Sequence, residues 1–300
     1  MVLSGRLRSP AAKLGAYAVV LAVVLGAGAA VGSAFGPEPS DEDHEPAAHD
    51  GGHADAAPEE PATAHPAGLA ISQEGYTLDL RTTVVDAARP AQLELVIEGP
   101  DDLPLTDYEV EHEKELHLVI VGRDLVDYAH VHPQRDERGT WTVTTPPLQP
   151  GSHRVYADFV PAGAEGITLA ADLDVPGTRS ATEPRQPSDG ANVEGFDVQF
   201  EGELVAGTES ELTLTVSREG QPVTDLEPYL GALGHLVAIR EGDLAYLHVH
   251  PLDETEGAGG PQVRFAVEVP TAGRYALFFD FSHGGVVRTA SVLATANAGG

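Results

Sequence analysis

An internal repeat constrains the fold of this chain more than any other feature of its sequence. The segment LTDYEVEHEKELHLVIVGRDLVDYAHVHP returns further along the chain as VTDLEPYLGALGHLVAIREGDLAYLHVHP. Tyr128 and Tyr246 match at an offset of 118, and beyond one four-residue insertion Asp158 and Asp280 match at an offset of 122. A chain that carries two such copies is expected to fold as two similar domains.

Each copy consists of short, alternating apolar runs that Gly, Pro and Asp interrupt. In the second copy, seven such runs fall near residues 195–202, 210–217, 235–241, 244–249, 262–269, 274–282 and 285–293. Seven short strands with turn signals at this spacing predict an antiparallel immunoglobulin-like β-sandwich. The chain has no Cys, so the Cys…Trp…Cys hallmark of antibody domains is absent and the strand pattern alone carries the prediction. We therefore expect an all-β fold of two tandem immunoglobulin-like domains, at residues 69–175 and 193–294, joined by a linker at 176–192.

The N-terminal segments predict export from the cytoplasm. Residues 14–35 carry no charge over 22 positions, which is long enough for a helix to cross a hydrocarbon core of roughly 30 Å. The basic tail, residues 1–13, is expected to stay in the cytoplasm and to leave the domains outside. A single-pass anchor in the cell membrane is favoured, although small residues near Ala27 and Gly32 also allow cleavage and secretion.

Two further segments are expected to lack a folded core. Residues 36–68 form an acidic stretch without Lys, Arg or aromatic residues, which predicts a disordered stalk. Its histidines either gather divalent cations loosely or are incidental; they are His44, His49, His53 and His65. Residues 295–300 are a short tail.

Composition excludes several classes of function. The chain has 17 Lys and Arg against 47 Asp and Glu, a formal net charge of −30, so no nucleic-acid partner is expected. The absence of Cys, with Met at position 1 alone, excludes thiolate and thioether metal sites. No nucleophile elbow, P-loop, Rossmann fingerprint or His-Glu-x-x-His motif is present, and we expect no enzyme.

The histidines of the repeat carry the main functional signal. Each copy has a His at the start of one strand, a His-x-His-Pro thirteen residues later, and an Asp-Phe at the end of a later strand. His248 and His250 alternate with Val249, so on a strand both imidazoles project from the same face. His235 begins the strand that pairs with them as a hairpin, which predicts three converging imidazoles.

Candidate metal ligands follow from this pattern in both copies. In the second copy they are His235, His248 and His250, with Asp280 or His283 as a fourth; in the first they are His117, His130, His132 and Asp158. We expect the more complete site in the second domain, because Val160 and Pro161 replace Ser282 and His283 in the first. His112 and His153 occur only in the first copy, where they either supply the missing ligand or face solvent. Separate sites and one site shared across the domain interface both fit this pattern.

Imidazole and carboxylate ligands without thiolate suit copper(II), zinc or nickel, and the Irving–Williams order favours copper(II). Because imidazole must be neutral to coordinate, the affinity is expected to fall as the pH drops through about 6.5. In the competing interpretation the histidines only brace a non-catalytic adhesion or scaffold module of the cell envelope. A bicupin-like metalloenzyme is the weaker alternative, since Gly242, His248, His250 and Glu254 match the first cupin motif but no later Pro-x-Gly-x2-His follows.

Three stretches, HVHP, HRVYADFVPAG and RYALFFDFSHGGVVRTASV, carry a resemblance. With them the chain resembles a group of secreted or membrane-anchored proteins of high-GC bacteria that have tandem His-x-His-Pro β-domains and are often associated with heavy-metal export systems. The resemblance covers most of residues 70–293. It implies a metal-handling role in the envelope, as a buffer, sensor or carrier that works with an export system.

Overall fold

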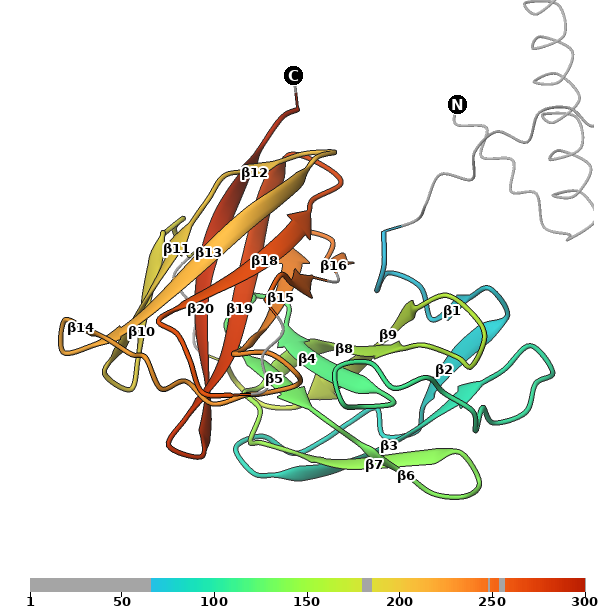
Figure 1. Ribbon diagram of the computed structural model, residues 1–300. Coiled ribbons are helices and arrows are strands. Elements are labelled where there is room, and N and C mark those ends of the chain that lie inside the picture. The colour runs from blue at the N-terminus through green and yellow to red at the C-terminus, as the bar shows by residue number, and fades with distance from the viewer. Residues whose placement is uncertain (1–65, 180–184, 248, 254–256, 300) are drawn as a thin grey trace, which may run out of the picture. The chain divides into compact units, whose positions relative to one another are not determined.

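The computed structural model describes residues 66–179, 185–247, 249–253 and 257–299. The predicted basic tail, the apolar segment 14–35, the stalk up to residue 65 and His248 lie outside these residues. Within the described ranges, no helix is long and apolar enough to span a membrane. The described chain is all-β, and both repeats belong to one compact unit, residues 62–300 (Figure 1).

Repeat 1 is a sandwich of two sheets. One sheet has the strand order β1 (Ser72–Gln73), β2 (Tyr76–Leu80), β3 (Ala91–Glu98), β7 (Thr140–Thr145), β6 (Gln134–Arg135). The other has the order β5 (Tyr128–Val131), β4 (His117–Gly122), β8 (Gly151–Phe159), β9 (Ile167–Val175). A buried core that includes Leu95, Leu118 and Trp141 fills the space between them.

Repeat 2 has the same plan. One sheet has the order β10 (Gly190–Val193), β11 (Phe196–Glu201), β13 (Glu209–Arg218), β18 (Gln262–Glu268), β17 (His250–Pro251), and β14 (Gln221–Pro222) also pairs with β13. The other has the order β12 (Leu204–Val205), β20 (Val286–Asn297), β19 (Gly273–His283), β15 (His235–Arg240), β16 (Tyr246–Leu247). The expectation of two tandem immunoglobulin-like β-sandwiches is confirmed.

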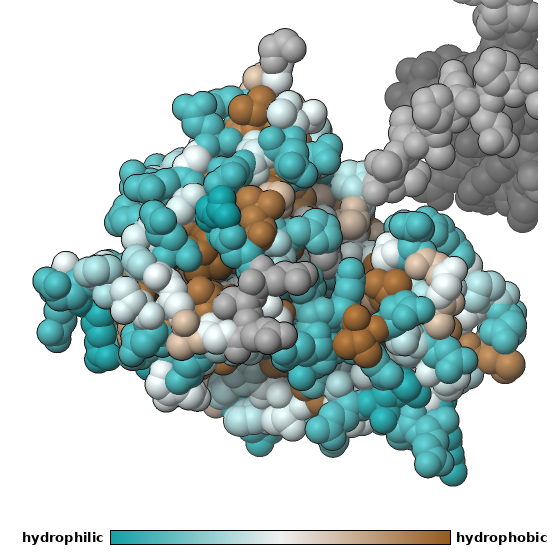
Figure 2. Space-filling model, viewed as in Figure 1, coloured by the Kyte–Doolittle hydropathy of each residue, from teal (hydrophilic) through white to brown (hydrophobic). Residues whose placement is uncertain are grey.

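Burial patterns explain how the strands are placed. β11 and β13 alternate between buried and exposed positions, as expected for a sheet that is covered on one face. Every position of β4, by contrast, is buried, as are five of the six in β15. Strands that are buried on both faces read as continuous apolar runs, and HLVIVG and HLVAIR have that form. Figure 2 shows hydrophilic side chains over most of the visible outer face.

A third apolar cluster joins the two repeats. Most of its residues lie in the two sheets that contain β4 and β15. The cluster consists of Val119, Val121, Leu125, Tyr156, Ala170, Val237, Ile239, Leu244, Tyr246, Ala276, Phe278 and Leu293. The Tyr128 ring stacks on Phe278 with centroids 4.1 Å apart, and the Tyr156 hydroxyl donates a hydrogen bond to the Leu244 carbonyl at 2.7 Å. The repeats therefore share a packed, mainly apolar interface, which defines the surroundings of the site.

Candidate metal centre

His117 and His235 are the first residues of β4 and β15, and their rings lie next to each other across this interface. The rings of His117 and His235 lie parallel, with an interplanar angle of 1° and centroids 5.5 Å apart. Both side chains are buried. His130, from β5, lies beside both, with ring centroids 5.4 Å from His117 and 4.9 Å from His235. The two repeats therefore contribute to one shared histidine group.

One ring nitrogen from each of these three histidines lies within 4.8 Å of the other two. His117 Nδ1 and His130 Nε2 are 3.2 Å apart. The opposite ring nitrogens face acceptors: His117 Nε2 lies 3.1 Å from the Glu111 carbonyl oxygen, and His130 Nδ1 lies 2.9 Å from Asp280 Oδ2. Since a carbonyl and a carboxylate only accept, these nitrogens carry the protons in the neutral rings. The facing nitrogens then carry lone pairs, which is the arrangement of metal-binding imidazoles.

Burial keeps part of the histidine cluster neutral. Burial, reinforced by the nearby His130, lowers the pKa of His117 to about 4. Burial, again reinforced by neighbouring histidines, lowers the pKa of His132 to about 3. At neutral pH these two rings are therefore in the form that can coordinate a metal.

Two buried carboxylates flank the group, one from each repeat. Asp158 lies opposite His117 in the pairing of β4 with β8, and Asp280 lies opposite His235 in the pairing of β15 with β19. Each accepts a hydrogen bond from a tyrosine of the other repeat: Asp280 Oδ2 lies 3.3 Å from the Tyr128 hydroxyl, and Asp158 Oδ2 lies 3.4 Å from the Tyr246 hydroxyl. The contacts thus repeat with an approximate two-fold relation. Asp280 orients His130 in this structure and is not part of the three-histidine group.

Two more histidines of repeat 1 pack against the group. The His132 ring centroid lies 4.8 Å from that of His130, and its buried Nε2 has no hydrogen-bond partner among the described residues. The His112 ring centroid lies 5.3 Å from that of His235. His112 has a left-handed backbone with φ of +45°, which is uncommon for a residue other than Gly. His112 is half-buried beside the group, but it is not one of the three histidines whose ring nitrogens converge.

The His-x-His-Pro motif of repeat 1 does not lie within one strand. In repeat 1 the chain leaves its sheet at the end of β5, Val131, and joins the other sheet at β6. In repeat 2, β16 ends at Leu247, and His250 already pairs with Ala266 of the other sheet. His130 and His132 therefore do not share one regular strand face, although their ring centroids lie 4.8 Å apart.

Other predicted residues lie elsewhere. His250 lines a polar cavity of about 340 Å³ with Asp158, Glu111 and Glu165. His283 packs on the Phe196 ring, and its Nε2 pairs with Asp225 at 3.3 Å, so the structure does not bring it to the three-histidine group.

His153 fits neither of its two predicted roles. Its side chain is buried, Nε2 lies 2.8 Å from Asp127 Oδ2, and Nδ1 lies 3.2 Å from the Gly151 carbonyl oxygen. Both nitrogens thus face acceptors, and the ring neither reaches the histidine group nor faces solvent. Sequence analysis missed this buried pair, since Asp127 and His153 stand far apart in the chain.

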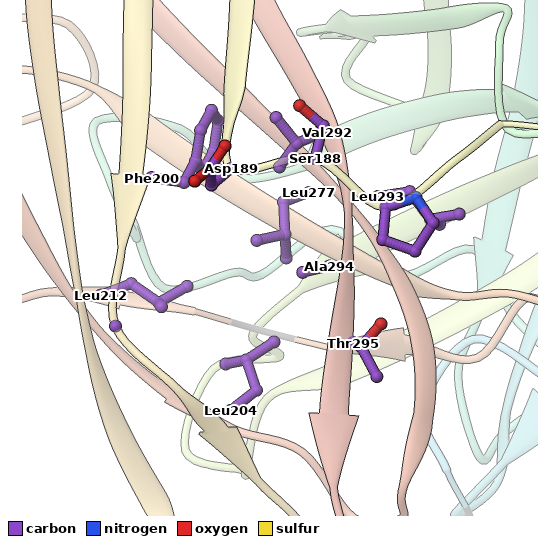
Figure 3. A pocket seen from close by; sticks show the side chains of 12 residues that line it. Ser188, Asp189, Phe200, Leu204, Leu212, Leu277, Val292, Leu293, Ala294 and Thr295 are labelled. Carbon is purple, nitrogen blue, oxygen red and sulfur yellow. The ribbon is translucent and has the colours of Figure 1, made fainter.

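A separate cavity of about 430 Å³ opens in repeat 2 (Figure 3). Its lining is mainly apolar and includes Phe200, Leu204, Leu212 and Leu277. It contains no histidine, and Asp189 is its one acidic residue. This cavity therefore offers no ligand set for a transition metal.

This chain has low overall similarity to the solved structures that it matches. No match is found among curated proteins. Among solved structures, the Escherichia coli adhesin FdeC is similar at 16% identity and a TM-score of 0.24, with 76% of this chain and 66% of that chain covered. A Salmonella alpha-2-macroglobulin mutant matches at 14% identity and a TM-score of 0.27, with 77% and 15% covered. Tandem Ig repeats of Dlar match at 8% identity and a TM-score of 0.21, with 75% and 98% covered.

This chain spans just under two thirds of the adhesin and a small part of the macroglobulin. A family model described as "Domain of unknown function (DUF8832)" matches residues 71–177 and again residues 191–298, well over half of the chain. The two matches coincide with the two sandwiches that build the shared histidine group. The chain therefore belongs to the DUF8832 family and carries two copies of its domain.

Proposed function

We propose that this chain is an extracytoplasmic metal-binding protein whose site lies between the two repeats. The observation that carries the proposal is the contact between His117 Nδ1 and His130 Nε2 at 3.2 Å, with the opposite ring nitrogens already bonded to Glu111 and Asp280. In neutral rings these hydrogen bonds leave one lone pair on His117 Nδ1 and one on His130 Nε2, directed at one another. A metal ion bound by both nitrogens would remove the repulsion between these lone pairs.

The spacing fits a metal ion. Imidazole nitrogens bind zinc at about 2.0–2.1 Å, so two ligands of one tetrahedral ion stand about 3.3 Å apart. The 3.2 Å contact lies close to that value, and His235 offers a third nitrogen in the same group. Three protein ligands leave one position of a tetrahedral ion for another ligand. His117, His130 and His235 are the residues that would hold the ion.

Copper(II) is the favoured ion, with zinc and nickel as the other candidates. The ligands are imidazoles without thiolate, a set that suits all three, and the Irving–Williams order ranks copper(II) highest. With the apolar segment 14–35 as a membrane anchor, the domains would present this ion outside the cell membrane as a buffer, sensor or carrier for a heavy-metal export system. The resemblance to envelope proteins associated with metal export supports this role.

A second candidate is a non-catalytic immunoglobulin-like scaffold or adhesion module with structural histidines. The same 3.2 Å contact is a normal hydrogen-bond length if His130 carries a second proton and donates to both Asp280 and His117. The apolar cluster that includes Val237, Ile239 and Phe278 already holds the repeats together without an ion. In this case the histidines form a buried polar brace.

Elemental analysis distinguishes the two candidates. The full chain, purified without a His tag, is dialysed against equimolar copper, zinc and nickel, and retained metal is measured by mass spectrometry. We expect about one tightly held ion per chain that is lost in both His117→Ala and His235→Ala. His283→Ala is the matched control, because it removes an imidazole outside the group, and its retained metal should equal that of the wild type.

The opposite result favours the scaffold. The interface site is not a metal centre if the wild type holds no metal. The same conclusion follows if His117→Ala and His235→Ala retain as much metal as the wild type. A brace of structural histidines further predicts that His117→Ala lowers the melting temperature in metal-free buffer, while added copper or zinc leaves the wild-type melting temperature unchanged.

A further inference from the structure

The site contains two buried carboxylates that are not needed as ligands of the three-histidine group. Asp158 and Asp280 are 8% and 2% exposed. They occupy equivalent positions on β8 and β19, one in each repeat. Charges of this kind are rarely buried without compensation, because removal of a carboxylate from water is costly.

The hydrogen bonds around these residues suit carboxylates that accept only. Asp280 accepts from His130 Nδ1 at 2.9 Å, from the Tyr128 hydroxyl at 3.3 Å and from Thr289 Oγ1. Asp158 accepts from Thr168 Oγ1 at 2.8 Å and from the Tyr246 hydroxyl. The hydroxyl groups of Tyr128 and Thr289 are neutral and leave the negative charge of the Asp280 carboxylate in place.

The charge beside the three-histidine group therefore favours a cation. Neutral imidazoles contribute no charge, and the Asp280 carboxylate, which accepts the hydrogen bond of His130, contributes a negative charge. We infer that Asp280, with Asp158 as its counterpart, selects a divalent ion over a monovalent one at the three-histidine group. This inference rests on the proposed metal-binding function and specifies the class of ion that the site accepts.

The magnitude follows from Coulomb's law. Asp280 lies behind the His130 ring, so a metal in front of that ring stands on the order of 7 Å from its charge. At an effective dielectric constant of about 20, each unit of charge on the ion changes its affinity by roughly 50-fold. Removal of the Asp280 charge thus weakens a divalent ion roughly 50-fold more than a monovalent ion of the same metal.

The variant Asp280→Asn removes the negative charge of the side chain and keeps nearly the same size and shape. Its amide oxygen still accepts the hydrogen bond from His130, so the ring keeps its orientation, but the negative charge is gone. Glu268→Gln is the control, because it removes one negative charge from an exposed position on β18. Circular dichroism checks that each variant is folded.

The experiment is a redox titration of the full chain loaded with one equivalent of copper. One electron from the electrode reduces copper(II) to copper(I), so the midpoint potential reports the ratio of the two affinities. We expect Asp280→Asn to raise the potential by roughly 100 mV, which is the 50-fold change at 59 mV per factor of ten. The control should leave the potential within a few tens of millivolts of the wild type.

Each outcome bears on a separate claim. A wild type that retains no copper overturns the proposed function itself. A wild type that binds copper, with an unchanged potential in a folded Asp280→Asn, overturns the charge selection and leaves metal binding intact. If Asp280→Asn does not fold, Asp280→Ser, which also removes the negative charge, takes its place, and a raised or an unchanged potential decides the inference.

Discussion

Acidification of the metal-free chain should lower its free energy of unfolding, because buried His117 resists protonation in the folded state. Burial lowers the pKa of His117 to about 4 in the folded chain, against 6.5 for an ordinary histidine in the unfolded chain. Between these values the unfolded state binds more protons than the folded state. The contribution of His117 to stability is therefore fully present above pH 6.5 and is lost as the pH falls toward 4.

The size of the effect follows from the same two values. Each pH unit inside this window changes the free energy of unfolding by about 1.4 kcal/mol. Between pH 7 and pH 5 the chain crosses roughly 1.5 units of the window, so His117 accounts for a loss of about 2 kcal/mol. His132, whose pKa burial lowers to about 3, acts in the same direction.

The assay is urea unfolding at pH 7, 6 and 5 in EDTA, followed by the fluorescence of the single, buried Trp141. His117→Gln is the comparison, because it cannot titrate and shares the background effect of the large negative charge. The free energy of unfolding should fall by about 2 kcal/mol more in the wild type than in the variant. Equal pH dependence in both proteins, or a wild type that gains stability on acidification, would refute the reasoning and favour the scaffold with structural histidines.

Two further variants test the interface and the pair outside the site. Ile239→Asp places an unpaired charge in the apolar cluster between the repeats, so metal retention should fall and protease cleavage of the linker at residues 176–189 should quicken, while the chain keeps its β-sheet signal in circular dichroism. Asp127→Ala leaves the buried His153 without its carboxylate and should lower the free energy of unfolding by about 3 kcal/mol in urea titrations, with metal retention unchanged. Loss of metal in Asp127→Ala, or full retention in Ile239→Asp, would contradict these assignments.

The central histidines of the site could be predicted from the repeat because the signal is local. His117 and His235 each begin an apolar run at the same place in the two copies, which the sequence shows directly. The pairing of these strands with the strands that bear Asp158 and Asp280 joins residues about 40 positions apart and is seen only in the structure. The role of Asp280 was harder to predict. It was expected as a ligand, and in the structure it accepts the hydrogen bond of His130 from the other repeat.

The sequence did contain one signal for the interface. The runs HLVIVG and HLVAIR are apolar at successive positions, where a strand covered on one face alternates. Val119 and Val237 thereby belong to the inter-repeat cluster, while their neighbours Leu118 and Leu236 belong to the cores of their own sandwiches. The pattern predicts that the outer face of each of these strands is covered, but it does not identify the surface that covers it.

The sequence by itself determined the two repeats, their all-β fold and the histidines at equivalent strand starts, because the alternation of apolar residues and the turn residues are local patterns. Tertiary structure alone decided that His117, His130 and His235 form one group, that His283 lies apart, and that Asp280 serves the opposite repeat. These contacts depend on which sheet faces pack together and on where the chain crosses between sheets after Val131 and Leu247. Such choices follow from the packing of whole apolar surfaces, which no short stretch of sequence specifies.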